Sequence, residues 1–171
     1  FRRGVDRFVR AARVVKRIRS MKIGQIGQRI DFFWSTITNE ADLLQRFGIQ
    51  VLPIDLTDMC RAIRQRTEAN RTAYRKELAE FKEWIRFNHY QNEDDILHNF
   101  SLRDVLLEAA REKDLDGFCI QTFSSIPNEL NSFLNFGCCL VADAGYPVAP
   151  ESDLHGAVSS VLVEAASPGG D

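Results

Sequence analysis

Short apolar segments with the length of buried strands alternate along this chain with longer amphipathic segments. The strand-like segments cover residues 21–27, 49–55, 116–122 and 138–142. Helical spacing or helix-capping residues mark the segments 4–19, 39–47, 68–88, 101–113, 127–136 and 151–166, and a further helix that begins at Thr57. Strands that alternate with helices are joined by right-handed crossovers. The sequence therefore predicts an α/β fold, a Rossmann-like three-layer domain with a mostly parallel sheet and helices on both faces.

Capping residues define several of these predicted helices. Asn39 has the position of an N-cap, and Gly48 follows the last residue of the same helix. Thr57 is expected to cap the next helix. Ser101 and Asp104 have the spacing of a capping box, which predicts a helix that begins there and runs to about Lys113.

The composition is that of one globular domain. The chain has 171 residues, of which 44% are hydrophobic and 27% are charged, enough for a buried core. A net charge of −2 gives no reason to expect a polyanionic partner. Residues 1–20 carry eight basic side chains against one acid, Asp6. We interpret them as a solvated face, or a face docked on another domain, and expect neither nucleic acid nor membrane as a partner.

The cysteines and the ends of the chain bear on its compartment and its extent. The four cysteines (Cys60, Cys119, Cys138 and Cys139) form no C-x-x-C pair, and no signal peptide or membrane-spanning run is seen, so we expect a reduced, cytoplasmic protein. Cys138 and Cys139 are expected on opposite faces of a strand. Phe1 enters a helical pattern at once, and the tail from Ser167 stops in a loop. We expect residues 1–171 to be a single domain excised from a larger multidomain protein.

A glycine pair and three histidines carry weak signals. Gly24 and Gly27 follow the first strand, but the third glycine and the helix start of a dinucleotide-binding fingerprint are missing, so a tight turn is the favoured interpretation. His89 and His98 flank a polar segment and are expected to be exposed. His155 would share a helical face with Glu151, four residues earlier, although a local role is favoured.

Acidic residues gather near the last predicted strand and helix. Asp143 would follow the strand, and Glu151 and Asp153 would lie in the first turn of the helix. Ligands bind at the carboxyl ends of parallel strands, and carboxylate oxygens suit Mg²⁺ or Mn²⁺. Acids at a helix start also offset the helix dipole without any further function, and this applies equally to Glu129, near the start of its own helix.

The segment from Gly145 to Ala157, Gly-Tyr-Pro-Val-Ala-Pro-Glu-Ser-Asp-Leu-His-Gly-Ala, resembles a motif of the L-fucose isomerase family and its L-arabinose isomerase relatives. Members typically read Gly-x-Pro-x-Ala-Cys-Glu-x-Asp-x-x-Gly-Ala there. Upstream elements follow in the same order, so the resemblance covers roughly residues 12–166, with this motif as its specific part. The chain would then be the central domain of such an isomerase.

The resemblance implies a metal-dependent aldose–ketose isomerase that acts through an ene-diol. In the family, a Glu, an Asp and a later His hold a divalent metal, usually Mn²⁺. By motif position, Glu129 would be metal ligand and base, and Asp153 metal ligand and second acid–base group. The third ligand, His, is expected in a C-terminal domain outside this chain, as an N-terminal domain also would be. Pro150 replaces the family's Cys, and Thr122-Phe123 replaces its Cys-Trp, which bears on substrate choice and activity.

The resemblance also implies the partners of the protein, and one alternative function is considered beside it. The substrate would be a small sugar, the full-length parent a homo-oligomer, and the isolated chain inactive or nearly so, because it lacks the His and the walls that exclude water. The alternative is a non-catalytic sugar- or metabolite-binding α/β module, since doubly wound domains host many functions. The sequence leaves the sugar and the metal undetermined.

Overall fold

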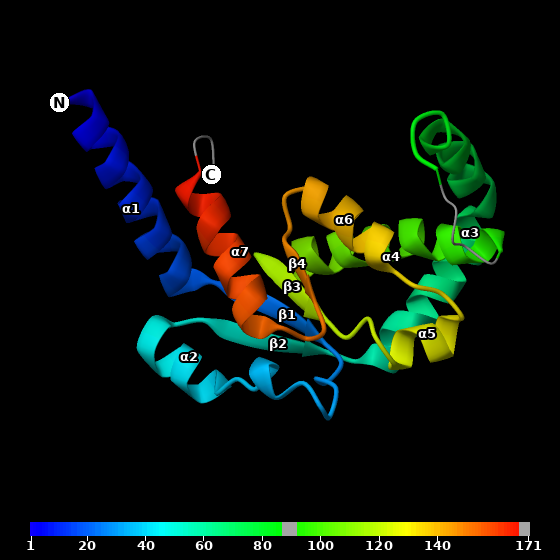
Figure 1. Cartoon of the computed structure of the whole chain (residues 1–171), viewed down its shortest axis with the longest axis horizontal. Helices are drawn as coiled ribbons and strands as arrows, with labels where there is room; N and C mark the ends of the chain where they lie inside the picture. The colour runs from blue at the N-terminus through cyan, green and yellow to red at the C-terminus, as the bar shows by residue number, and fades with distance from the viewer. Residues whose placement is uncertain (87–91, 168–171) are drawn as a thin grey trace.

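A four-stranded parallel sheet forms the centre of the molecule (Figure 1). The computed structural model describes residues 1–86 and 92–167. The strands are β1 (Lys22–Ile26), β2 (Gln50–Ile54), β3 (Gly117–Ile120) and β4 (Val148–Pro150), in the order β2-β1-β3-β4, and all neighbours are parallel. The chain first moves from β1 to β2 on one side and then returns to β3 on the other. The predicted α/β class with a parallel sheet is confirmed.

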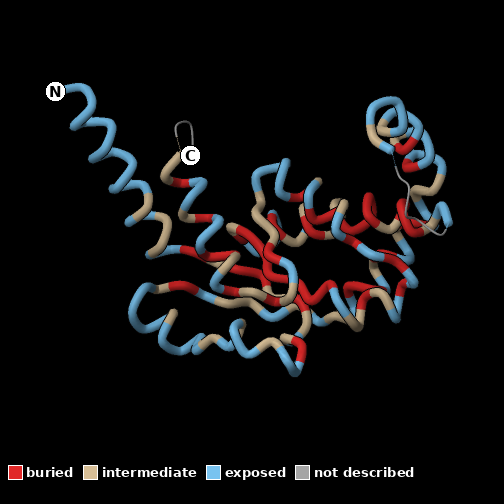
Figure 2. The backbone as a smooth tube through the Cα atoms, viewed as in Figure 1, coloured by how far each residue is buried: buried red, intermediate tan, exposed pale blue. Residues whose placement is uncertain are grey.

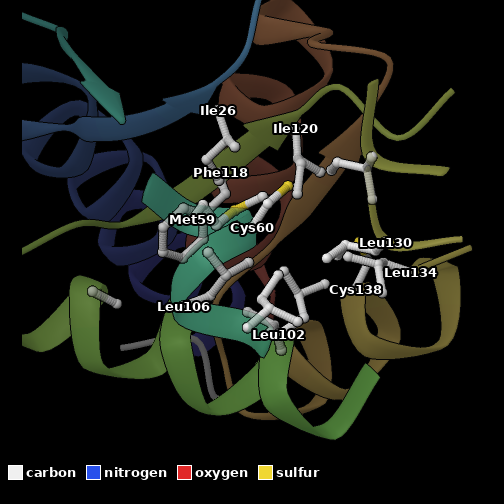
Figure 3. Packing of buried hydrophobic residues seen from close by; sticks show 14 of the residues in the cluster. Ile26, Met59, Cys60, Leu102, Leu106, Phe118, Ile120, Leu130, Leu134 and Cys138 are labelled. Carbon is white, nitrogen blue, oxygen red and sulfur yellow. The ribbon is translucent and has the colours of Figure 1, made fainter. Parts of the chain in front are cut away.

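Helices cover both faces of this sheet. On one face, α3 (Leu56–Phe81), α4 (Glu93–Lys113), α5 (Ser125–Leu130) and α6 (Asn135–Asp143) contribute to a core with Ile26, Phe118 and Ile120 of the strands (Figure 3). On the other face, α7 (Leu154–Ala166) packs on Ile23 and Cys119, and α1 (Arg2–Ser20) and α2 (Glu40–Phe47) lie at its margin. Successive residues of β3 thus point to opposite cores, as expected for a strand buried on both faces.

The helix starts follow local hydrogen-bonding chemistry, with two corrections. Asn39 caps α2 and Gly48 ends it in the left-handed conformation, as predicted. However, Asp55 and not Thr57 caps α3, because its carboxylate accepts the backbone N–H groups of the next turn. The capping box of α4 is formed by Asn92 and Asp95, nine residues before the predicted Ser101, which instead lies buried in mid-helix.

The segment 138–142 is a further correction, because it is helical. These residues belong to α6, and the fourth strand is the three-residue β4. The N–H of Gly137 donates to Asn99 Oδ1 at 2.7 Å, and the absent side chain lets α6 approach α4 closely. Because α6 leads into the amino end of β4, Asp143 lies at the opposite edge of the sheet from the carboxyl ends, and not at a strand exit.

The four cysteines are free thiols. Cys60, Cys119 and Cys138 are buried, whereas Cys139, the next residue along α6, is exposed. Burial raises the pKa of the Cys119 and Cys138 thiols to about 12. Cys138 and Cys139 therefore differ in burial, but they do so on the helix α6 and not on the two faces of a strand as expected.

The helix α1 extends away from the sheet, and none of its residues is buried (Figure 2). Its last turn reaches the core through Ile18 and the ion pair of Arg17 with Asp116. Its apolar residues nearer the amino end remain exposed, with Phe8 at 74%. No helix in the described part of the chain is long and apolar enough to cross a bilayer.

Candidate active site

The carboxyl edge of the sheet contains the candidate site. The strand order reverses direction between β1 and β3, and in such sheets the crevice outside the strand ends at that point binds ligands. A cavity of about 530 Å³ lies there, lined by residues of β1 and β2 and of the segments that follow β1, β2 and β3. A second cavity, of about 140 Å³, adjoins it through Gln25 and Gln28 and extends to Leu154 at the start of α7.

Asp153 lies at this edge as the N-cap of α7. Its Oδ1 accepts the backbone N–H of Gly156 at 2.9 Å. Its Oδ2 lies where a side chain at position 156 would begin, because a Cβ there would be only 2.4 Å from this oxygen. The glycine of the Asp-x-x-Gly sequence therefore makes room for the carboxylate.

Glu151 and His155 do not form the expected pair. Glu151 and Ser152 have φ values of 64° and 54°, so they form a left-handed turn between β4 and α7 and lie outside the helix. The turn is tied down by Ser152, whose N–H donates to Ile120 O at 3.0 Å and whose hydroxyl donates to Gly27 O at 3.3 Å. The prediction that Glu151 and His155 share a helical face was therefore wrong, and His155 is exposed.

Glu129 lies near the end of α5, on the other face of the sheet from α7. Its side chain is 57% exposed and pairs with Arg64 of α3, with 3.2 Å between Arg64 Nη2 and Glu129 Oε2. The same guanidinium donates to the backbone carbonyl of Glu129. Glu129 and Asp153 thus make their hydrogen bonds to different elements. Within residues 1–86 and 92–167, no three His, Cys, Asp or Glu side chains are grouped to hold a metal ion.

Gly24, within β1, and Gly27, directly after it, both take structural positions. A Cβ at Gly24 would lie 2.8 Å from the Phe118 ring, so this glycine permits close packing between neighbouring strands. Gly27 has a φ of 74° and turns the chain at the edge of the cleft. The interpretation as a tight turn is confirmed for Gly27, whereas Gly24 lies within β1 and not in a turn after it.

The two positions that depart from the family motif lie beside the site. Thr122 is buried, whereas Phe123 is 57% exposed and its ring lies 6.0 Å from that of Phe33 in the loop after β1. Pro150 ends the edge strand β4. An edge position tolerates proline, since one side of the strand has no partner.

Sequence reasoning missed the polar groups that line the cleft, Gln121 and Asp55 among them. Each follows the last residue of a strand, Ile120 of β3 and Ile54 of β2. The rule that ligands bind at carboxyl ends would have selected both.

His98 is another correction, while His89 lies outside the described residues. His98 is part of α4, and its Nδ1 is shielded from solvent without a hydrogen-bond partner in the described structure. Burial lowers the pKa of His98, and the carboxylates of Asp94 and Asp95 oppose this shift.

Comparison with known proteins relates the chain to a sugar isomerase. No protein-family model matches the chain. It is 27% identical over 156 residues, 91% of its length, to a protein of Alkalicoccus urumqiensis named sulfoquinovose isomerase. The matched part is 34% of that protein, so the chain spans about a third of the length of this curated relative. The similarity supports a sugar-isomerase-like relationship and does not single out the L-fucose isomerases.

Proposed function

We propose that this chain is part of a metal-dependent aldose–ketose isomerase that acts through an ene-diol on a small sugar. The observation that carries the proposal is the similarity over 91% of the chain to a protein named sulfoquinovose isomerase. The motif from Gly145 to Ala157 adds the L-fucose and L-arabinose isomerases as models for the chemistry. Sulfoquinovose joins fucose- and arabinose-like sugars as a candidate substrate.

The donor chemistry of Glu129 and Asp153 fits a hard divalent cation. Asp153 uses Oδ1 as a helix cap, and Glu129 directs Oε2 toward Arg64, so each carboxylate retains one oxygen without a protein donor in the described structure. Carboxylate oxygens suit Mn²⁺ or Mg²⁺, and the third ligand would be a His outside this chain. When bound, the metal would act as a Lewis acid toward the substrate oxygens.

The two carboxylates would also move protons. Interconversion of an aldose and a ketose transfers a proton between neighbouring carbons, which needs a base that the solvent does not compete with. Glu129 is our choice for that base, and Asp153 for the second acid–base group. Gly156 would keep Asp153 oriented, because its missing side chain leaves space for the carboxylate.

The proposal extends to the setting of the reaction. The full-length protein would be a cytoplasmic homo-oligomer, with a sugar as its partner and neither nucleic acid nor membrane. The isolated chain would have little or no activity, because the third ligand and the surrounding walls would come from other domains.

The test is an isomerase assay on the full-length protein, stripped of metal and then given Mn²⁺. The substrates are aldopentoses, aldohexoses, L-fucose and sulfoquinovose. We expect activity to return with metal and to be lost in Glu129→Gln and Asp153→Asn. Glu151→Gln and Asp143→Asn are matched controls that should retain activity, since one lies in the turn and the other at the far edge of the sheet. A metal-loaded wild-type protein that converts none of these sugars contradicts the proposal.

A non-catalytic sugar-binding module is the second candidate. The observation in its favour is the polar cleft at the strand ends. Full-length protein that binds sugars with equal affinity with and without metal, and never interconverts them, would support this candidate over the isomerase.

A further inference from the structure

We propose that Ser152 is a positioning residue for Asp153, because it ties the turn between β4 and α7 to the ends of β1 and β3 and so directs the Asp153 carboxylate. The inference rests on the proposed function for what that carboxylate does, but the clamp itself needs neither metal nor sugar. Ser152 occupies the variable position of the Glu-x-Asp sequence, between Glu151 and Asp153, so the resemblance to the isomerase motif assigns it no role.

The backbone of this turn is in a conformation that residues with a side chain rarely adopt. Glu151 and Ser152 have φ values of 64° and 54°, in the left-handed region where a Cβ crowds the following carbonyl oxygen. The other non-glycine residues with positive φ in the described structure, Asp114 and Asn131, are single residues of the types that tolerate this region best. Two consecutive strained residues persist only where surrounding contacts hold them. This turn therefore depends on contacts with the rest of the fold.

Ser152 supplies those contacts. It is only 2% exposed. Its N–H donates to Ile120 O at 3.0 Å, and its hydroxyl donates to Gly27 O at 3.3 Å. Ile120 is the last residue of β3, and Gly27 directly follows β1. Because both acceptors are backbone carbonyls at the ends of the two central strands, the sheet itself fixes the position of Ser152.

The hydroxyl group explains the choice of side chain at this position. A glycine would adopt the left-handed conformation without strain, and glycine is present at three other positions of positive φ, Gly27, Gly48 and Gly145. An alanine would fill the buried space without a polar group that needs a partner. Serine has both the strain that glycine avoids and the polar group that alanine avoids, so the hydrogen bond to Gly27 O is what serine contributes over either.

The clamp lies next to the carboxylate that it would direct. The N–H of Asp153 donates to Pro150 O at 3.2 Å. The N–H of Leu154 donates to Ser152 O at 3.0 Å, so hydrogen bonds close the turn before and after Asp153. Oδ1 of Asp153 accepts the N–H of Gly156 at 2.9 Å. Ser152 thus fixes the backbone of Asp153 relative to the strand ends, while Gly156 fixes its side chain, and the direction of Oδ2 follows from the two together.

A carboxylate that serves as metal ligand and acid–base group must be in place before the substrate arrives. A displacement of about 1 Å lowers a rate by as much as about 100-fold. Without the hydroxyl of Ser152, the strained turn has one anchor fewer and relaxes toward ordinary φ values, which moves Asp153 relative to the strand ends. Because Ser152 is itself buried, we expect its substitution to lower kcat through Asp153, with little effect on KM for the sugar.

The experiment measures the exchange of backbone amides with water by NMR in the ¹⁵N-labelled 171-residue chain. The amide of Gly156 reports on the Asp153 carboxylate, because this carboxylate is its hydrogen-bond acceptor. Ser152→Ala should speed its exchange about tenfold, the effect of weakening one hydrogen bond, whereas amides later in α7, such as that of Val161, should keep their rates. In an Asp153→Ala background the acceptor is gone, so Ser152→Ala should change Gly156 exchange less than about twofold.

A second substitution and a matched control complete the design. Ser152→Gly removes the same hydroxyl while relieving the left-handed strain, so it tests the clamp where Ser152→Ala destabilises the fold. Ser167→Ala is the control, because it removes a serine hydroxyl that donates to Val163 O at 2.9 Å at the far end of α7. In the full-length protein, both Ser152 variants should lower the kcat of isomerisation at least about tenfold and change KM less than about twofold, and Ser167→Ala should change neither.

The outcomes separate this inference from the isomerase. Faster exchange confined to Gly156 and the turn supports the clamp, whether or not the full-length protein converts any sugar. Unchanged Gly156 exchange in both Ser152 variants overturns the inference even if isomerase activity is found. Equal acceleration along the whole of α7 also overturns it, because Ser152 would then stabilise the fold without directing Asp153. An active full-length protein whose kcat is unchanged in both variants overturns it as well.

Discussion

The contact between Gly156 and the carboxylate of Asp153 gives a sharp energetic prediction. Gly156 lies in the first turn of α7, where Gly→Ala normally stabilises a helix by up to about 1 kcal/mol. Here the added Cβ would lie 2.4 Å from Asp153 Oδ2, about 1 Å short of ordinary van der Waals contact. The carboxylate must therefore move away, and its 2.9 Å hydrogen bond to the N–H of Gly156 is then lost.

The magnitude follows from these two opposing effects. Loss of an N-cap costs about 1 kcal/mol, so Gly156→Ala should leave the free energy of unfolding almost unchanged. In an Asp153→Ala background there is no carboxylate to displace, and the same change should stabilise by about 1 kcal/mol. The coupling energy between the two positions is then about 1 kcal/mol, as is usual for residues in direct contact.

Urea denaturation of the wild type, both single variants and the double variant measures this coupling. Gly4→Ala is the control, because no atom lies within 4 Å of a Cβ there, and its effect should be independent of position 153. Equal stabilisation by Gly156→Ala in both backgrounds would refute the reasoning. In the full-length protein, a displacement of about 1 Å should lower isomerase activity about 100-fold while stability is retained.

Three further predictions concern the body of the fold. One thiol, Cys139, should react with Ellman's reagent in the native chain, and the other three only after denaturation; more than one fast thiol would contradict the burial pattern. Burial lowers the pKa of His98 in the folded chain below the ordinary value of 6.5. Just below pH 6.5 the unfolded chain therefore binds more protons than the folded chain, so the free energy of unfolding should decrease as the pH is lowered from about 7.5 to about 5.5. His98→Gln should reduce that fall in urea midpoints, and an unchanged fall would assign it to other groups. Asn99→Ala removes the acceptor of the Gly137 N–H and two donated hydrogen bonds in a fully buried position; it should cost about 3 kcal/mol in urea denaturation, and a cost below about 1 kcal/mol would contradict these contacts.

The parts of the fold that sequence predicted well are those with a strong local signal. β1, β2 and β3 are short apolar runs, of which the first is followed by a glycine and the second by a helix-capping residue, and each was located to within two residues. The segment 138–142 misled because a short apolar run cannot be distinguished from a buried helix by periodicity. β4 has three residues next to Pro147 and includes Pro150, so its local signal is poor. It is a strand because Phe118 and Ile120 offer it hydrogen-bonding partners.

The candidate site could be predicted only in part, for a different reason. Asp153 as a helix-start residue follows from local spacing, and the structure agrees. The cleft depends on Asp55, Gln25 and Gln121, which are far apart in sequence and meet because three strands end at the same edge. His98 was misjudged because its acidic neighbours resembled a loop, although the capping box at Asn92 places them in the first turn of α4.

The position of Glu129 bears on the energy that metal binding would require. The proposal needs this carboxylate to exchange Arg64 for a metal ion. Both side chains of that ion pair are about half exposed, at 57% and 49%, and such surface pairs contribute about 0–1 kcal/mol. Release of the carboxylate therefore costs little compared with the gain from coordinating a divalent cation.

The second hydrogen bond of Arg64 goes to the backbone carbonyl of Glu129 and does not involve the Glu129 carboxylate. It would hold α5 against α3 while the carboxylate turns. Arg64→Ala should therefore change metal affinity in the full-length protein less than tenfold, whereas Glu129→Gln should abolish tight binding. A larger effect of Arg64→Ala would show that the pair orients Glu129 for its ligand role.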